Sequence, residues 1–229
     1  MPTRQESVVP NLDTTYQVNE IFHTIQGEGA MQGAPATFIR LQGCTVGCPW
    51  CDTKYTWKAG GKRMTVRQIL EAIGKEIRPL IVITGGEPTL YDLDDLMLAL
   101  ADYAGLFYSS HTIQLETSGQ NAFKGKYVPN WVTWSPKPNL HYATEIPPQL
   151  IHEIKFVVDD DLTVDIIAQV VDSYRDVAKM DVPVILMPEG CPPSPEHIQK
   201  TMSFLDHFNK HGKSNYYFGD RLQYRLGVK

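Results

Sequence analysis

The sequence of 229 residues contains little cysteine and no long apolar run. It has only four cysteines, and a chain of this length can bury a core without cross-links, so a disulfide framework is disfavoured. No apolar segment approaches the roughly 20 residues of a membrane-spanning helix, and the polar start from Met1 to Asp13 lacks the apolar stretch of a signal peptide. We therefore expect a cytoplasmic protein that does not enter a membrane.

An excess of positive charge is also missing. The chain has 21 basic and 26 acidic residues and a formal net charge of -5, so direct binding to nucleic acid is disfavoured. The seven histidines show no metal-ligand pair at helical spacing, and no internal repeat is visible. The length predicts one domain over residues 17–229, preceded by a flexible, polar N-terminal arm over residues 1–16.

Three of the four cysteines stand in one short run, Cys44-Thr45-Val46-Gly47-Cys48-Pro49-Trp50-Cys51. Three thiolates at this spacing can hold a four-iron cluster and leave one iron without a protein ligand. That iron can bind the amino and carboxylate groups of S-adenosylmethionine and pass an electron to its sulfonium, which generates a carbon radical. The alternative is a zinc-stabilised binding module, but zinc usually needs four ligands and Cys191 is distant in the sequence.

Short β-rich apolar runs alternate with helical patterns, as in parallel strands joined by crossover helices. Six strands are predicted, at Thr37 to Leu41, Leu80 to Thr84, Ile113 to Leu115, Trp131 to Trp134, Ile154 to Val158 and Val184 to Met187. Four helices are predicted, at Thr65 to Ile77, Asp92 to Gly105, Val164 to Tyr174 and Pro195 to Phe208. Because two of the links between strands are short, the fold class is α/β with a partial, abbreviated (β/α)6 TIM-like barrel.

Distinctive motifs follow five of the six predicted strands. The carboxyl ends of parallel strands carry the active site in this architecture, so the site should form where these motifs meet. The motifs are Cys44 to Thr53, Gly85-Gly86-Glu87-Pro88, Glu116-Thr117-Ser118-Gly119, Ser135-Pro136-Lys137 and Met187-Pro188-Glu189-Gly190.

Several side chains near these motifs have an interpretation from chemistry alone. The glycines Gly85 and Gly86 let the backbone approach the methionine group of a ligand, and Glu87 can accept from its ammonium group. Arg40 ends a strand, so its guanidinium either binds a carboxylate at the mouth of the barrel or forms a surface ion pair. Thr53 beside a carboxylate suits magnesium, and Trp50 between two thiols shields a cluster or stacks on adenine.

Taken together, six motifs between about Val18 and Gly190 resemble the 7-carboxy-7-deazaguanine synthases, which belong to the radical S-adenosylmethionine superfamily. They are Gln26-Gly27-Glu28-Gly29, Arg40-Leu41-Gln42-Gly43-Cys44, Cys48-Pro49-Trp50-Cys51-Asp52-Thr53, Thr84-Gly85-Gly86-Glu87-Pro88, Glu116-Thr117-Ser118-Gly119 and Ser135-Pro136-Lys137. The resemblance implies a radical lyase that converts 6-carboxy-5,6,7,8-tetrahydropterin to 7-carboxy-7-deazaguanine with loss of ammonia, in the biosynthesis of queuosine and related 7-deazapurines.

The resemblance also implies cofactors, partners and site residues. The cofactors are a 4Fe-4S cluster, S-adenosylmethionine and magnesium, and the partners are a flavodoxin-like electron donor and a second copy of the chain. The cluster ligands are Cys44, Cys48 and Cys51, the magnesium ligand is Thr53, and the pterin contacts are Ile25, Gln26, Gly27, Arg40 and Thr84. The contacts to S-adenosylmethionine are Trp50, Gly86, Glu87, Ser135, Pro136, Lys137, Met187, Pro188, Glu189 and Gly190.

Two departures from the family pattern accompany the resemblance. Met187 stands where many relatives have Gln, and Gln223-Tyr224-Arg225 stands near where many have a Gln-Thr-His-Lys run, so no C-terminal contact to substrate is assigned. A glycyl-radical activating enzyme is the second enzymatic alternative, since it is similar in cysteine spacing and in the Gly-Gly-Glu-Pro loop. Arg40 and Thr53 favour a small acid over the protein substrate of such an enzyme.

Overall fold

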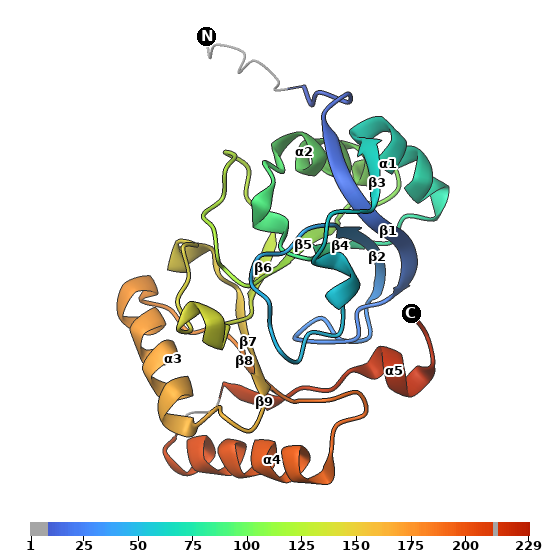
Figure 1. The fold of residues 1–229 in the computed structure, drawn as a ribbon. Coiled ribbons are helices and arrows are strands. Elements are labelled where there is room, and N and C mark those ends of the chain that lie inside the picture. Colours follow the sequence, from blue (N-terminus) through green and yellow to red (C-terminus); the bar gives the residue numbers. More distant parts are fainter. Residues whose placement is uncertain (1–8, 213–214) are drawn as a thin grey trace.

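A nine-stranded sheet runs through the computed structural model, which describes residues 9–212 and 215–229 (Figure 1). The strand order among these residues is β3-β1-β2-β4-β5-β6-β7-β8-β9, and from β2 through β4 to β9 all neighbours are parallel. The strands are β1 (Thr15–Ile25), β2 (Pro35–Leu41), β3 (Lys62–Thr65), β4 (Leu80–Gly85), β5 (Thr112–Thr117), β6 (Trp131–Trp134), β7 (Glu153–Val158), β8 (Val184–Pro188) and β9 (Tyr216–Phe218).

The six predicted strands are confirmed as β2 and β4 to β8. Three further strands carry weak local signals, because β1 and β3 contain many polar residues and β9 has three residues. The antiparallel pairing of β1 with β2 stacks Phe22 on Phe38, with ring centroids 5.1 Å apart. Residues 1–8 of the predicted arm lie outside the described residues, and β1 begins at Thr15.

The four predicted helices are also confirmed, with shifted ends. They are α1 (Val66–Ile73), α2 (Asp94–Gly105), α3 (Val164–Ala178) and α4 (Pro195–Lys210), and a short α5 (Leu222–Leu226) follows β9. The predicted capping box is present, because Thr65 and Gln68 exchange hydrogen bonds between side chain and backbone at 3.0 and 3.2 Å. Helix α1 stops at Ile73, since Gly74 has a φ of 61° and starts a 3₁₀ turn.

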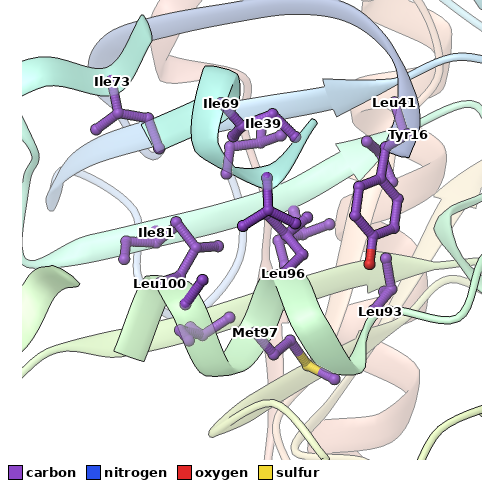
Figure 2. Close-up of a cluster of buried hydrophobic side chains, with 14 of the residues drawn as sticks. Tyr16, Ile39, Leu41, Ile69, Ile73, Ile81, Leu93, Leu96, Met97 and Leu100 are labelled. Carbon is purple, nitrogen blue, oxygen red and sulfur yellow. The ribbon is translucent and has the colours of Figure 1, made fainter. Parts of the chain in front are cut away.

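Side chains that alternate along β2 and β4 point to opposite faces of the sheet. Ile39, Leu41 and Ile81 pack on one face against Ile69 of α1 and Leu96 and Leu100 of α2 (Figure 2). Phe38, Arg40 and Thr84 lie on the other face, where they line a cavity. Helices α1 and α2 thus cover one face of the sheet. The opposite face, called the inner face below, carries the cavity and polar residues such as Arg40 and Thr84.

The sheet does not close within the described residues, since β3 and β9 form its two edges. The links from β5 to β6 and from β6 to β7 contain no α-helix, and the second of them has only the 3₁₀ turns Pro138–Leu140 and Pro148–Leu150. The prediction of a partial barrel is therefore confirmed. None of the described helices is long and apolar enough to cross a membrane.

Candidate active site

A cavity of about 370 Å³ lies on the inner face of the sheet, at the carboxyl ends of the parallel strands. It brings together most of the residues predicted from the sequence: Ile25, Gln26, Gly27, Arg40, Cys44, Cys48, Trp50, Cys51, Thr53, Thr84, Gly86, Glu87, Ser135, Lys137 and Met187. Four predicted residues do not line it: Pro136, Pro188, Glu189 and Gly190.

The cysteine loop between β2 and the 3₁₀ turn Lys54–Thr56 forms one wall of the cavity. Its three thiols are free, and burial raises the pKa of Cys44 and Cys48 above the ordinary thiol value. Asn139, in the 3₁₀ turn Pro138–Leu140, holds the loop, because its side-chain amide donates to the carbonyls of Val46 and Gly47 at 3.0 Å each. These hydrogen bonds connect the cysteine loop to the segment that follows β6.

The three thiols fit a four-iron cluster better than a single zinc ion. Among the described residues, no group of three His, Cys, Asp or Glu side chains converges on one metal ion. A cubane does not need such convergence, because each thiolate binds a different iron. Cys191 is exposed and does not line the cavity, so within the described chain the wall offers three thiols and no fourth.

The Gly85-Gly86 turn at the end of β4 packs directly on the cysteine loop. A Cβ atom at Gly86 would lie 2.0 Å from the carbonyl oxygen of Gly43, and one at Gly85 would lie 2.2 Å from that of Leu41. Gly85 also has a φ of 135°, which disfavours other residues. These glycines are therefore required for the approach of two backbones, whether or not a ligand is bound.

Glu87 is buried, with 1% of its surface exposed, and its carboxylate is fully used by protein donors. One oxygen accepts from the backbone and hydroxyl of Thr89 and from the hydroxyl of Thr117, at 3.0, 2.7 and 2.6 Å. The other accepts from the backbone and hydroxyl of Ser118. Since a carboxylate offers about four lone-pair sites, Glu87 mainly ties the end of β4 to the end of β5.

Trp50 is held between two charged groups from distant parts of the chain. Its indole N–H donates to Asp159 Oδ2 at 2.7 Å, just after β7, and the Lys137 ammonium lies 4.5 Å from the centre of the ring system. Burial lowers the pKa of Lys137, while the nearby Cys48 opposes this shift. The arrangement fixes the orientation of the indole at the edge of the cavity.

A second polar group, which we call the Glu28 cluster, consists of Glu28, Glu116, Lys155 and Arg221. The Lys155 ammonium lies 2.7 Å from Glu28 Oε2 and 3.7 Å from Glu116 Oε1, and Arg221 Nε lies 3.3 Å from Glu28 Oε1. Burial alone would raise the pKa of Glu28, but the two cations outweigh burial and lower it to about 2. Burial likewise opposes the charge of Lys155, yet its carboxylate partners raise its pKa above the ordinary value.

The segment after β9 returns to the Gln26–Gly29 loop and continues into α5, after which the C-terminal residue Lys229 reaches β1, where its carbonyl accepts from the Thr24 hydroxyl (Figure 1). The backbone N–H of Leu222 donates to the carbonyl of Gly27 at 3.0 Å, and Arg221 donates to the carbonyl of Gly190 at 2.6 Å. A Cβ atom at Gly27 would lie 1.5 Å from Gln223 Oε1, so a larger residue here would displace the Gln223 side chain. The segment spans the open side of the partial barrel.

Arg40 and Thr53 have contacts that bear on their predicted roles. The Arg40 guanidinium lines the cavity and forms an ion pair with Glu20, with Nε 2.8 Å from Glu20 Oε1. The Thr53 hydroxyl lies 3.4 Å from Cys51 Sγ, next to Asp52 in the wall of the cavity. Magnesium binds hydroxyl and carboxylate oxygens, so the side chains of Thr53 and Asp52 offer atoms that suit the predicted ion.

Comparison with known proteins identifies the family. The sequence model of the Radical SAM superfamily matches residues 38–125. A 7-carboxy-7-deazaguanine synthase from Synechocystis sp. is 40% identical over 151 residues, which is 66% of this chain and 68% of the relative. One from Escherichia coli K12 is 39% identical over 168 residues, 62% of this chain and 72% of the relative. The chain belongs to the 7-carboxy-7-deazaguanine synthase family.

A solved structure from this family supports the assignment at the level of the fold. The crystal structure of QueE from Escherichia coli superimposes with a TM-score of 0.66 and 29% identity, and covers 90% of this chain and 93% of that chain. The family resemblance drawn from the sequence is thereby confirmed, and the protein is a radical S-adenosylmethionine enzyme. Membership of this superfamily implies a 4Fe-4S cluster and S-adenosylmethionine as cofactors.

Sequence reasoning assigned no role to three residues that line the cavity, Glu28, Lys155 and Arg221. It also missed Asp159, which does not line the cavity but accepts the hydrogen bond of Trp50. One signal for Lys155 was present, because a lysine in the otherwise apolar strand Ile154 to Val158 must find a partner. No local signal connects Asp159 with Trp50, since 109 residues separate them.

Proposed function

We propose that this protein converts 6-carboxy-5,6,7,8-tetrahydropterin to 7-carboxy-7-deazaguanine, with loss of ammonia, for queuosine or a related 7-deazapurine. The observation that carries this proposal is one cavity of about 370 Å³ in which the three free thiols face the same space as the Arg40 guanidinium. A cavity of this size suits small ligands, and an arginine in its wall suits a substrate with a carboxylate.

The cofactors would occupy the end of the cavity formed by the cysteine loop. Cys44, Cys48 and Cys51 would hold the 4Fe-4S cluster, while Trp50, Gly86 and the segment Ser135 to Lys137 would contact S-adenosylmethionine. When bound, the cluster and S-adenosylmethionine together supply a carbon radical that can take a hydrogen atom from the substrate. We extend the same role to Met187 and to the turn Pro188 to Gly190, which borders the cavity through Met187.

The protein itself must bind and orient the pterin. Arg40 would bind the substrate carboxylate, and Ile25, Gly27 and Thr84 would contact the ring. The side chain of Gln26 donates to Gln114 at 2.9 Å and to Glu116 at 3.2 Å, so Gln26 would act chiefly by fixing the shape of the loop. A rigid wall of this kind holds the reacting hydrogen at one place relative to the cofactor.

Magnesium, the electron donor and the assembly state belong to the same proposal. Thr53 would help to hold magnesium, and the ion would supply positive charge that favours binding of a carboxylated substrate. A flavodoxin-like protein would supply the electron, and the enzyme would act as a homodimer, as the family resemblance implies. Residues 17–229 would form a single catalytic domain, since one sheet connects β1 with β9.

The decisive experiment is an anaerobic turnover assay. The reconstituted protein is incubated with carboxytetrahydropterin, S-adenosylmethionine, magnesium and dithionite, and the products are identified by mass. We expect 7-carboxy-7-deazaguanine and ammonia in equal amounts. Reductive cleavage of S-adenosylmethionine without any deazapurine would contradict the assigned substrate and leave only the superfamily assignment.

A further inference from the structure

Glu20 on β1 lies in the wall of the cavity beside Arg40, and no motif in the sequence drew attention to it. Three donors surround its carboxylate. Arg40 Nε donates to Oε1 at 2.8 Å, the Tyr55 hydroxyl donates to the same oxygen at 3.3 Å, and the Lys229 ammonium contacts Oε2. Burial alone would raise the pKa of Glu20, but Lys229 and Arg40 outweigh burial and lower it, so the group is ionised at neutral pH.

The pair is not an ordinary surface ion pair. The side chains of Arg40 and Glu20 are only 16% and 19% exposed, and both face the cavity that holds the thiols. Arg40 also lies over the Phe22 ring, with its central guanidinium carbon 5.8 Å from the ring centre. The Phe22 ring on one side and a carboxylate on Nε together restrict the guanidinium.

This geometry leaves the outer edge of the guanidinium for a ligand. A guanidinium has five N–H donors, and Glu20 takes the one on Nε. Within the described chain, no hydrogen bond joins the two terminal nitrogens of Arg40 to another residue. Those nitrogens form the fork that binds a carboxylate through two parallel hydrogen bonds.

We propose that Glu20 is a positioning residue, which holds Arg40 by its Nε so that the terminal nitrogens receive the carboxylate of the substrate. This inference rests on the proposed function, because it takes the substrate to be a carboxylated pterin. Tyr55 and Lys229 share the negative charge of Glu20, so Arg40 keeps enough positive charge to attract a second carboxylate. Glu20 therefore contributes to selectivity for an acidic substrate without touching it.

The test measures pterin binding by the reconstituted holoenzyme with S-adenosylmethionine and no reductant, so that no turnover occurs. Two probes are compared, namely 6-carboxytetrahydropterin and tetrahydropterin without the carboxylate. Glu20→Ala should raise the Kd of the carboxylated probe by about tenfold or more and leave the Kd of the other unchanged. Glu20→Gln keeps an oxygen that accepts from Arg40 Nε, so its Kd for the carboxylated probe should stay within about threefold of wild type.

Glu71→Ala serves as the matched control, because Glu71 is an exposed residue of α1 outside the cavity. If Glu20→Ala weakens the binding of both probes equally, Glu20 only supports the structure of the cavity, and the proposal fails. Tighter binding of the carboxylated probe in both Glu20 variants would also overturn it, since Glu20 would then act only by repulsion.

Glu20→Asp provides a second test in case the alanine variant does not fold. It keeps the charge but shortens the side chain, so it should weaken the carboxylated probe more than Glu20→Gln does. The reverse order would refute the proposal. Failure of the proposed function is recognised separately, because the wild-type enzyme would then bind the two probes equally or make no deazapurine.

Discussion

The cysteine loop and the Glu28 cluster lie in the same cavity but are built in different ways. The three thiols come from eight consecutive residues, 44–51, and carry the chemistry of the family. The Glu28 cluster collects charges from the loop after β1, from β5, from β7 and from the segment after β9, and all of them are paired with each other. The comparison indicates that the loop supplies reactivity, whereas the cluster holds the two sides of an open barrel together.

The strongest test of this comparison removes one thiol. Cys48→Ala should abolish binding of the intact cluster and lower the rate of product formation by about three orders of magnitude or more, because the residual iron cannot cleave S-adenosylmethionine. The melting temperature of the cluster-free protein should change by only a few degrees, about the effect of losing one small buried side chain.

Iron and sulfide content, the electron paramagnetic resonance spectrum and calorimetry of the apoprotein provide the measurements. Cys191→Ser is the control, since Cys191 is exposed and lies outside the cavity, and it should retain iron and activity. Loss of iron in this variant would mean that the cluster takes a fourth thiol.

The reciprocal experiment removes the central cation of the Glu28 cluster. Lys155→Met would leave Glu28 and Glu116 without their shared partner, and breaking a buried pair in this way costs about 3–5 kcal/mol. The melting temperature should therefore fall by on the order of 10 °C. Lys75→Met, at an exposed position, is the control for loss of charge. An unchanged melting temperature would show that the cluster does not hold the barrel together.

The same variant should change the pH dependence of stability. The pKa of Glu28 is lowered to about 2 in the folded protein, below its value of about 4.3 in an unfolded chain. Its contribution to stability is therefore complete above about pH 5 and is lost as the pH falls toward 2. Denaturant unfolding between pH 6 and pH 3 should show a shallower loss of stability in Lys155→Met than in wild type.

A smaller effect is expected at the hydrogen bond between Trp50 of the cysteine loop and Asp159, just after β7. Asp159→Ala removes the acceptor of the Trp50 indole N–H, a hydrogen bond to a charged group at 2.7 Å. Binding of S-adenosylmethionine should weaken by about tenfold while the iron content stays constant. Asp161→Ala, at a neighbouring exposed position, is the control. Equal affinities in these two variants would remove the positioning role of Asp159.

The smallest effect concerns magnesium. Thr53→Ala should raise the magnesium concentration needed for half-maximal turnover by several-fold, because the ion loses one of its few protein ligands. The maximal rate at saturating magnesium should be largely retained. A titration of product formation against magnesium measures both quantities. Superimposable curves for the wild type and Thr53→Ala would exclude Thr53 as a ligand.

The sequence predicted best those features that are formed by residues adjacent in the chain. The cysteine spacing, the Gly-Gly-Glu-Pro turn and the capping box at Thr65 are each set by a few adjacent residues, and all were recognised in advance. The ends of α1 and the strands β1, β3 and β9 were missed or misplaced, because their signals are polar or short. Glu87 lines the cavity, and its contact with the ligand stays a prediction, but no local signal indicated that its carboxylate would accept from Thr89, Thr117 and Ser118.

The amino-acid sequence by itself determined the reactive group, the family and the order of six strands and four helices, since spacing and periodicity are properties of neighbouring residues. Only the tertiary structure decided which side chains are paired at the site: Asp159 with Trp50, Glu20 with Arg40, and Lys155 with Glu28. The reason is that these side chains come from different strands and loops, and chain order does not specify how close such elements come in the folded protein. Their pairing follows from strand register and from the return of the chain after β9.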